Sequence, residues 1–201
     1  AKWDGSSWSA VGSPAFGAPS RYNASIDALA VSGSNLYVGG LFTDVGAMSA
    51  NYIAKWDGSS WSALGSGLNS NVQALVVSGS DLYVGGAFTT AGGVAANRVA
   101  KWNGSSWAAL GPGMNDSVWA LAASSNGVYA GGDFTTAGGN GATHIANWNG
   151  SSWTNLGSGM NNAVLALAVS GSDVYAGGYF FTAGGSAGTK IAKWNGCSWR
   201  K

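Results

Sequence analysis

Apolar and polar residues alternate with a period of two along most of this chain, and turn residues interrupt the alternation at short intervals. Glycine or β-branched residues break every 3.6-residue pattern, so no helix is expected. In the stretch from 72 to 111 the pattern predicts four short strands, at 72–78, 82–88, 98–102 and 106–110. We expect Asn103-Gly104 to close a two-residue type I′ hairpin between the last two, because both positions of that turn need positive φ.

The same unit recurs with a step of 46 residues, as Trp56, Trp102, Trp148 and Trp194 show. Each of these tryptophans is followed five residues later by a second one, at 61, 107, 153 and 199. An incomplete first copy carries Trp3 and Trp8, and a seven-residue insertion separates it from the next copy. Ten of the 11 tryptophans thus belong to five copies of one motif, and only Trp119 lies outside it.

Four antiparallel strands repeated at this spacing are typical of a propeller blade. We therefore predict an all-β protein, a β-propeller of four full blades and an N-terminal half blade in a single domain spanning 1–201. The first strand of each unit is apolar on both faces and should lie innermost, along the central channel. The predicted parts are the half blade 1–12, the insertion 13–22, and blades at about 26–65, 72–111, 118–157 and 164–201.

Paired glycines lie inside the second strand of each unit, where glycine by itself destabilises a sheet. We expect their bare surface to receive a Trp ring from a neighbouring strand or blade. A buried Trp removes about 150–250 Å² from water, so the ten repeated tryptophans should hold the blades together. The pairs are Gly39-Gly40, Gly85-Gly86, Gly131-Gly132 and Gly177-Gly178.

Closure of the ring stays open at this point, because the last unit already has its own third and fourth strands. Three arrangements remain: a five-position ring with one incomplete blade, a ring completed by a second chain, or a piece of a longer repeat array. Unpaired strand edges invite association. We therefore expect a homo-oligomer or the continuation of a longer array.

The segments 53–69 (IAKWDGSSWSALGSGLN) and 82–93 (LYVGGAFTTAGG) resemble tandem repeats of large secreted bacterial proteins. They are also similar to the repeats of the fungal cortical cell-polarity marker and, more remotely, to kelch and galactose-oxidase propellers. The resemblance implies a propeller fold and an extracellular or cell-surface location. The copper-ligating tyrosines and histidines and the thioether-linked Cys of galactose oxidase have no counterparts here, so oxidase chemistry is not implied.

Composition narrows the classes of partner. A net charge of +1 with only 8% charged residues offers no basic surface for nucleic acid. No apolar run reaches the length of a membrane span, about 18 residues. The single cysteine, Cys197, can form neither an internal disulfide nor a thiolate metal site. We predict no metal and no cofactor.

Catalytic candidates are sparse. His144, the only histidine, occupies a repeat position filled elsewhere by Tyr52, Arg98 and Lys190, which indicates a solvated loop edge. Glycosidic hydrolysis would need two acids about 5–9 Å apart. The aspartates outside turns lie at different repeat positions; they are Asp27, Asp44, Asp116 and Asp133. We therefore predict no enzyme, and a glycan hydrolase or lyase ranks third among the hypotheses.

A binding site is expected where side chains depart from the repeat, because packing does not dictate them. One inner-strand position holds Asp27, Gln73, Trp119 and Leu165 in the four units. An indole beside carboxylate and amide groups suits a sugar ring. We expect Asn69, Asn115 and Asn161 to lie on the same loop face of the propeller as this position.

The first hypothesis is thus a non-catalytic, lectin-like extracellular module that binds a glycan or another surface ligand. The alternative is a structural or adhesive repeat segment that binds other protein chains or copies of itself. For Trp119 itself, the alternative to ligand binding is that its side chain plugs the narrow axial channel and binds nothing.

Overall fold

The computed structural model describes residues 1–12, 14–19, 23–187 and 190–200, in which every regular element is a β-strand. Four antiparallel four-stranded sheets, here called blades 1 to 4, contain most of the strands. In each blade the strands lie side by side in chain order. Blade 1 consists of β4 (Ser25–Ser32), β5 (Asn35–Leu41), β8 (Ile53–Trp56) and β9 (Trp61–Ala63); blade 2 of β10 (Val72–Ser78), β11 (Asp81–Gly86), β14 (Val99–Trp102) and β15 (Trp107–Ala109); blade 3 of β16 (Val118–Ser124), β17 (Gly127–Gly132), β20 (Ile145–Trp148) and β21 (Trp153–Asn155); and blade 4 of β22 (Val164–Ser170), β23 (Asp173–Gly178), β26 (Ile191–Trp194) and β27 (Trp199–Arg200).

Short strand pairs accompany the blades, and the sequence pattern did not predict those between the second and third strand of each blade. The N-terminal hairpin is a separate two-stranded sheet of β1 (Lys2–Trp3) and β2 (Trp8–Ser9). Within the predicted insertion, β3 (Phe16–Gly17) pairs with β6 (Asp44–Val45), which lies between the second and third strands of blade 1, while residues 13 and 20–22 lie outside the described part. The small hairpins are β6 (Asp44–Val45) with β7 (Met48–Ser49), β12 (Thr90–Ala91) with β13 (Val94–Ala95), β18 (Thr136–Ala137) with β19 (Asn140–Gly141), and β24 (Thr182–Ala183) with β25 (Ser186–Ala187).

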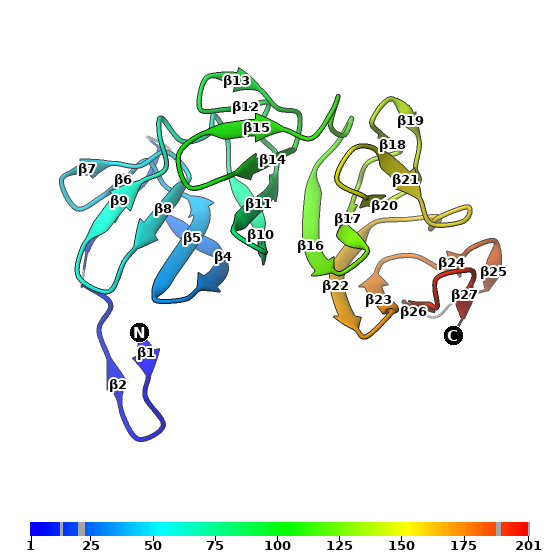
Figure 1. The fold of residues 1–201 in the computed structure, drawn as a ribbon, viewed down its shortest axis with the longest axis horizontal. Helices are drawn as coiled ribbons and strands as arrows, with labels where there is room; N and C mark the ends of the chain where they lie inside the picture. The colour runs from blue at the N-terminus through cyan, green and yellow to red at the C-terminus, as the bar shows by residue number, and fades with distance from the viewer. Residues whose placement is uncertain (13, 20–22, 188–189, 201) are drawn as a thin grey trace.

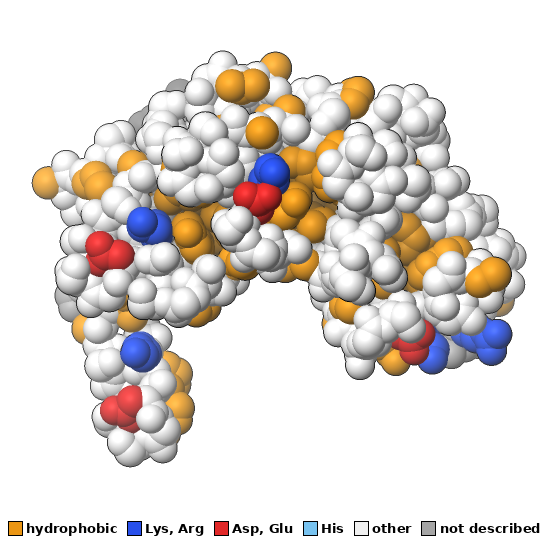
Figure 2. All heavy atoms as spheres, viewed as in Figure 1, with side chains coloured by type: hydrophobic (Ala, Val, Ile, Leu, Met, Phe, Trp, Pro, Cys, Tyr) orange, Lys and Arg blue, Asp and Glu red, His pale blue; other side chains and the backbone are white. Residues whose placement is uncertain are grey.

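The four blades follow one another around an open arc (Figure 1). Their first strands, β4, β10, β16 and β22, lie on the concave side, as predicted, and each contacts the first strand of the next blade. The β1–β2 hairpin projects beyond blade 1 on one side of the opening, and blade 4 lies on the other side (Figure 1). Few charged side chains appear on the visible surface, and hydrophobic ones fill the seams between blades (Figure 2). The arrangement is compatible with propeller-like blades.

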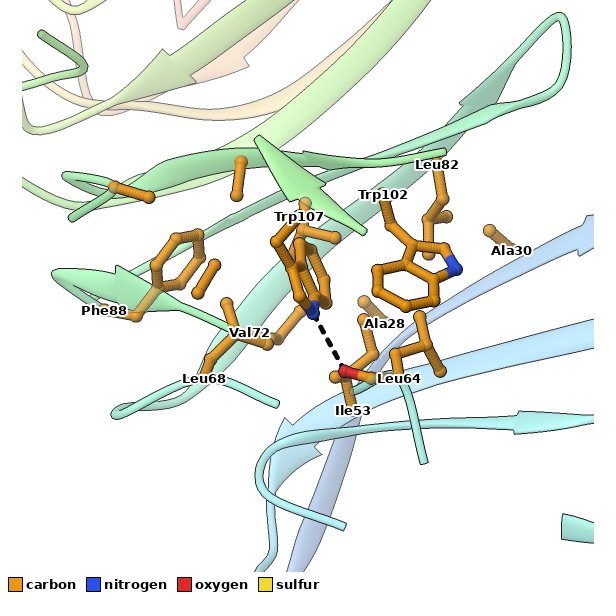
Figure 3. Close-up of a cluster of buried hydrophobic side chains, with 14 residues drawn as sticks. Ala28, Ala30, Ile53, Leu64, Leu68, Val72, Leu82, Phe88, Trp102 and Trp107 are labelled. Atoms are coloured by element: carbon orange, nitrogen blue, oxygen red, sulfur yellow. Dashed lines mark hydrogen bonds between the residues drawn. The ribbon is translucent and has the colours of Figure 1, made fainter. Parts of the chain in front are cut away.

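The hydrophobic core lies between blades rather than inside them. One cluster joins Ile53 and Leu64 of blade 1 to Val72, Trp102 and Trp107 of blade 2 (Figure 3). The Trp107 Nε1–H group donates a hydrogen bond of 2.8 Å to the Leu64 carbonyl. The same bond, also 2.8 Å, joins Trp153 to Leu110 and Trp199 to Leu156. The prediction that the repeated tryptophans hold neighbouring blades together is confirmed at these three junctions.

The explanation expected for the paired glycines is wrong. A Cβ on Gly39 would collide with the Cγ1 atom of Val72, the first residue of the next blade's inner strand. Gly85 and Gly131 face Val118 and Val164 in the same way. A Cβ on the second glycine of each pair would instead meet a backbone carbonyl at the start of its own blade's inner strand. That carbonyl belongs to the residue just before the strand in blades 2, 3 and 4, and to Ser25, the first residue of β4, in blade 1. Valine, and not tryptophan, therefore occupies the space that glycine leaves.

The turn expected at Asn103-Gly104 is also wrong. Trp102 pairs with Trp107, so the loop has four residues, and only Gly104 among them has a positive φ, 99°. The Asn103 Oδ1 atom accepts hydrogen bonds from the N–H groups of Ser105 and Ser106 at 3.0 and 2.8 Å. This side chain closes the loop and removes the need for two left-handed residues.

Asp57 fills the Asn103 position in blade 1. Hydrogen bonds from the backbone N–H groups of Ser60 and Ser59 hold the pKa of Asp57 well below its usual value. The carboxylate is thus the form that this turn selects.

The glycine contact predicts a difference between two equivalent substitutions. Gly131→Ala should lower the free energy of unfolding by about 1–3 kcal/mol, because the new methyl group overpacks the seam against Val164. Gly177→Ala should change it little in the monomer, because the nearest atoms to a Cβ there are 3.8 and 3.9 Å away. Urea unfolding of both variants measures this, and equal losses would contradict the account.

The Trp–carbonyl bond predicts a second difference. Trp153→Phe leaves the buried Leu110 carbonyl without its donor and should cost about 1–3 kcal/mol in addition to lost ring area. Trp61 is the matched control, because its Nε1 atom is buried with no partner among the described residues. Trp61→Phe should therefore cost less than Trp153→Phe in the same unfolding experiment. A larger loss for Trp61→Phe would refute the bond's contribution.

Candidate functional site

The residues predicted to form a site occupy a β-bulge at the start of each inner strand. The pairing of β16 with β17 shifts register between Val118 and Ala120, which leaves Trp119 as the extra residue. Blades 1, 2 and 4 shift at the same point. A bulge residue makes no regular ladder contact, and bulges commonly re-aim side chains at binding sites. The four bulge residues are Asp27, Gln73, Trp119 and Leu165.

Trp119 is half-buried, and its Nε1–H group donates a hydrogen bond of 2.7 Å to Oδ2 of Asp133. Asp133 follows β17, whose last residue, Gly132, pairs with Val118. From the sequence, Asp133 was expected only as an isolated acid, and its pairing with Trp119 was not predicted. A signal existed, since both positions depart from the repeat in the same blade: the counterparts of Asp133 are Leu41, Ala87 and Tyr179.

Asp27 and Gln73 lie at the equivalent bulges of blades 1 and 2. Asp27 is exposed, whereas Gln73 is partly buried and its Oε1 atom has no partner in the described part of the chain. No hydrogen bond among the described residues joins Asp27, Gln73 and Trp119 to one another. The structure thus places one candidate on each of three consecutive blades.

The asparagines expected on the loop face use their polar groups within their own blades. Asn69 Oδ1 accepts hydrogen bonds from the N–H groups of Thr89 and Thr90 at 2.8 and 3.0 Å, and its Nδ2 donates to Thr89 Oγ1 at 2.8 Å. Asn115 makes the same three contacts in blade 3. Asn161 accepts from Phe181 and Thr182 in blade 4. These side chains pin two loops together, which leaves fewer polar groups for a ligand.

Blade 4 carries two exposed aromatic side chains that the sequence analysis did not select. Tyr179 and Phe181 are 60% and 59% exposed. The Lys190 Nζ atom lies 3.8 Å from the Phe181 ring centroid, a cation–π contact. Small or polar residues fill the Phe181 position in blades 2 and 3, where Thr89 and Thr135 stand. Departure from the repeat was again the available signal.

The expectation of a solvated loop edge at His144 holds only in part, because His144 lies in the bend just before β20 but is not fully exposed. His144 is half-buried, and its Nδ1 atom lies 2.9 Å from the Met160 carbonyl. Its φ is +65°, and Tyr52, Arg98 and Lys190 share this left-handed conformation at φ of 65–67°. The position tolerates different side chains because the backbone is held on both sides: His144 N–H donates to Phe134 O, and His144 O accepts from Gly132 N–H.

The two remaining candidate acids, Asp44 and Asp116, lie on separate elements and have separate hydrogen-bond partners. Asp44 lies in β6 and accepts from Thr43, while Asp116 lies in the loop before β16 and accepts from the N–H group of Ser117. In the ranges that the structure describes, no three His, Cys, Asp or Glu side chains are placed to hold a metal ion. Those ranges also contain no helix that could cross a membrane.

The left-handed backbone at His144 predicts that glycine is more stable than alanine at this position, the reverse of the usual order. His144→Gly should be more stable to unfolding than His144→Ala by about 1 kcal/mol, because alanine keeps the cost of a left-handed φ and glycine does not. Glycine elsewhere in a strand is the less stable choice. Thermal unfolding of the two variants decides, and alanine being the more stable would disprove strain at this position.

Comparison with known proteins bears on the fold. The chain matches no protein-family model and no curated protein. It is similar to the computationally designed Ika4 protein with a TM-score of 0.53 and 19% identity, over 90% of this chain and 96% of that one. It is also similar to the computationally designed Ika8 protein, with a TM-score of 0.48 and 18% identity, over 84% of this chain and 57% of that one. The likeness to Ika4 supports an all-β fold of many short strands in antiparallel sheets.

Proposed function

We propose that the chain is part of a β-propeller, with four full blades and an N-terminal half blade, and acts as a non-catalytic extracellular module that binds a glycan or another surface ligand. The observation that carries the proposal is the Trp119–Asp133 pair at a bulge of the concave strands. Packing between blades needs neither residue, since the other blades have different side chains at both positions.

The chemistry of these side chains suits a sugar. An indole face takes the C–H groups of a pyranose ring, while neighbouring carboxylates accept hydrogen bonds from hydroxyl groups. The hydrogen bond to Asp133 fixes the orientation of the Trp119 ring before a ligand arrives, which lowers the entropy cost of binding. Tyr179 and Phe181, on the neighbouring blade, offer further aromatic surface.

A second candidate function is a structural or adhesive segment that associates with protein chains. It is favoured by large apolar side chains exposed at both ends of the arc, such as Leu29 and Ile191 at 61% and 58%. Exposed apolar patches commonly mark protein interaction sites. A hydrolase or lyase has less support, because Asp133 is engaged by Trp119 and the other candidate acids lie on separate elements.

A glycan array with labelled protein tests the first function. We expect wild-type binding to a defined set of glycans, and a loss of at least about tenfold in affinity for Trp119→Ala, since stacking on an aromatic ring is removed. Trp8→Ala is the matched control, because Trp8 is 69% exposed on the distant β1–β2 hairpin and should leave binding unchanged. Absence of any bound glycan, or equal affinity of Trp119→Ala, would reject the sugar-binding proposal.

A further inference from the structure

Each junction between consecutive blades joins two different surfaces. The leading face of a blade is the one that meets the preceding blade, and in blade 2 it presents Val72 and Leu75. The trailing face meets the next blade, and in blade 1 it presents Gly39 and Ile53. Val72 and Ile53 are both fully buried in this contact. The same pair of faces meets again between blades 2 and 3 and between blades 3 and 4.

Among the described residues, no blade lies against the leading face of blade 1. Ile26, Leu29 and Val31 are 43%, 61% and 66% exposed. Their counterparts at the blade 1–blade 2 junction, Val72, Leu75 and Val77, are buried or half-buried. The exposed side chains are therefore those that every other blade uses to pack.

The trailing face of blade 4 is open in the complementary way. Ile191 is 58% exposed, while its counterparts Ile53, Val99 and Ile145 are 0% exposed. The Cβ direction of Gly177 meets no side chain from a following blade, unlike that of Gly39. The two end surfaces of the molecule are thus the two halves of a junction that the chain forms three times internally.

A hollow of about 420 Å³ marks the unfilled position beside blade 1. The hollow is lined by Ile26, Leu29 and Trp61 of blade 1 and by Ala10 and Val11, which follow β2. The β1–β2 hairpin keeps the tilted Trp pair of the outer strands, with ring centroids 5.5 Å apart. Its Trp8 side chain is 69% exposed, and hydrophobic atoms of the hairpin are visible toward the opening of the arc (Figure 2).

We propose that a second copy of this chain docks head to tail, with its blade 4 trailing face on the blade 1 leading face. The β22–β23 strands of that copy fill the hollow, where they set Gly177 and Ile191 against Ile26 and Leu29. Because β26 already pairs with β23 in that copy, its own β26–β27 hairpin keeps the outer place beside β23. The proposal does not depend on the ligand site, since the bulge residues lie at one end of the inner strands.

Such a contact is heterologous, so a pair of copies still has one free leading face and one free trailing face, unless these two faces close a ring. The wild-type protein should therefore associate progressively, and its average mass should rise with concentration above the 20.1 kDa of one chain. A two-fold contact between identical faces would instead stop at a dimer.

Charge substitutions at the two faces test the interface by sedimentation equilibrium. Leu29→Asp and Ile191→Asp should each weaken association at least about tenfold, because a carboxylate would be buried without a partner. Both side chains are more than half exposed in one chain, so each variant should keep the wild-type circular dichroism spectrum. Val94→Asp, at a 49% exposed position on a small hairpin, is the matched control and should associate like wild type.

Mixing the two variants gives the decisive result. Leu29→Asp retains an intact trailing face and Ile191→Asp an intact leading face, so an equimolar mixture should form heterodimers and stop there. Gly177→Ala, which has room in one chain, should weaken wild-type association without loss of fold. A monomeric wild type at all concentrations, association unchanged by Leu29→Asp, or no heterodimer in the mixture would overturn the proposal.

Discussion

The structure depends on one contact, in which a valine at the start of the inner strand of blades 2, 3 and 4 packs on a bare glycine of the preceding blade. A tryptophan from the outer strand of the same blade closes the other end of this seam with a hydrogen bond to a leucine carbonyl. A single blade is too thin to bury both of its faces, so its stability comes from its neighbours. The paired glycines, the repeated tryptophans and the apolar inner strands are all requirements of this seam.

The unusual composition follows from the same constraint. Blades that meet on both faces have little surface left for charge, and many of the polar residues lie in turns and loops. There they close the chain on itself, as Asn103 does in its hairpin loop and Asn69 does between two loops. A side chain that neither packs in a seam nor closes a loop is therefore conspicuous, and Trp119 with Asp133 is the clearest case.

Sequence periodicity was sufficient for the elements that repeat. It placed the strand 72–78 at its observed bounds and the first strands on the concave side. It could not choose between valine and tryptophan as the partner of Gly39, because that contact joins residues far apart in the chain. The two-residue strands β12 and β13 are too short to show alternation. Trp119 was found as a departure from the repeat, but its bond to Asp133 requires the register of β16 and β17.

At the bulge that begins every inner strand, the residues that pack the fold are different from the residue that is free to vary. Flanking residues such as Val118 and Ala120 carry the ladder pairing and the seam, while the extra residue between them carries neither. Aspartate, glutamine, tryptophan and leucine at the four bulges show that this backbone accepts acidic, amide, aromatic and aliphatic side chains alike. The repeated units can thus differ at the bulge position one residue at a time. The surface chemistry of the arc can change in this way while its architecture stays constant.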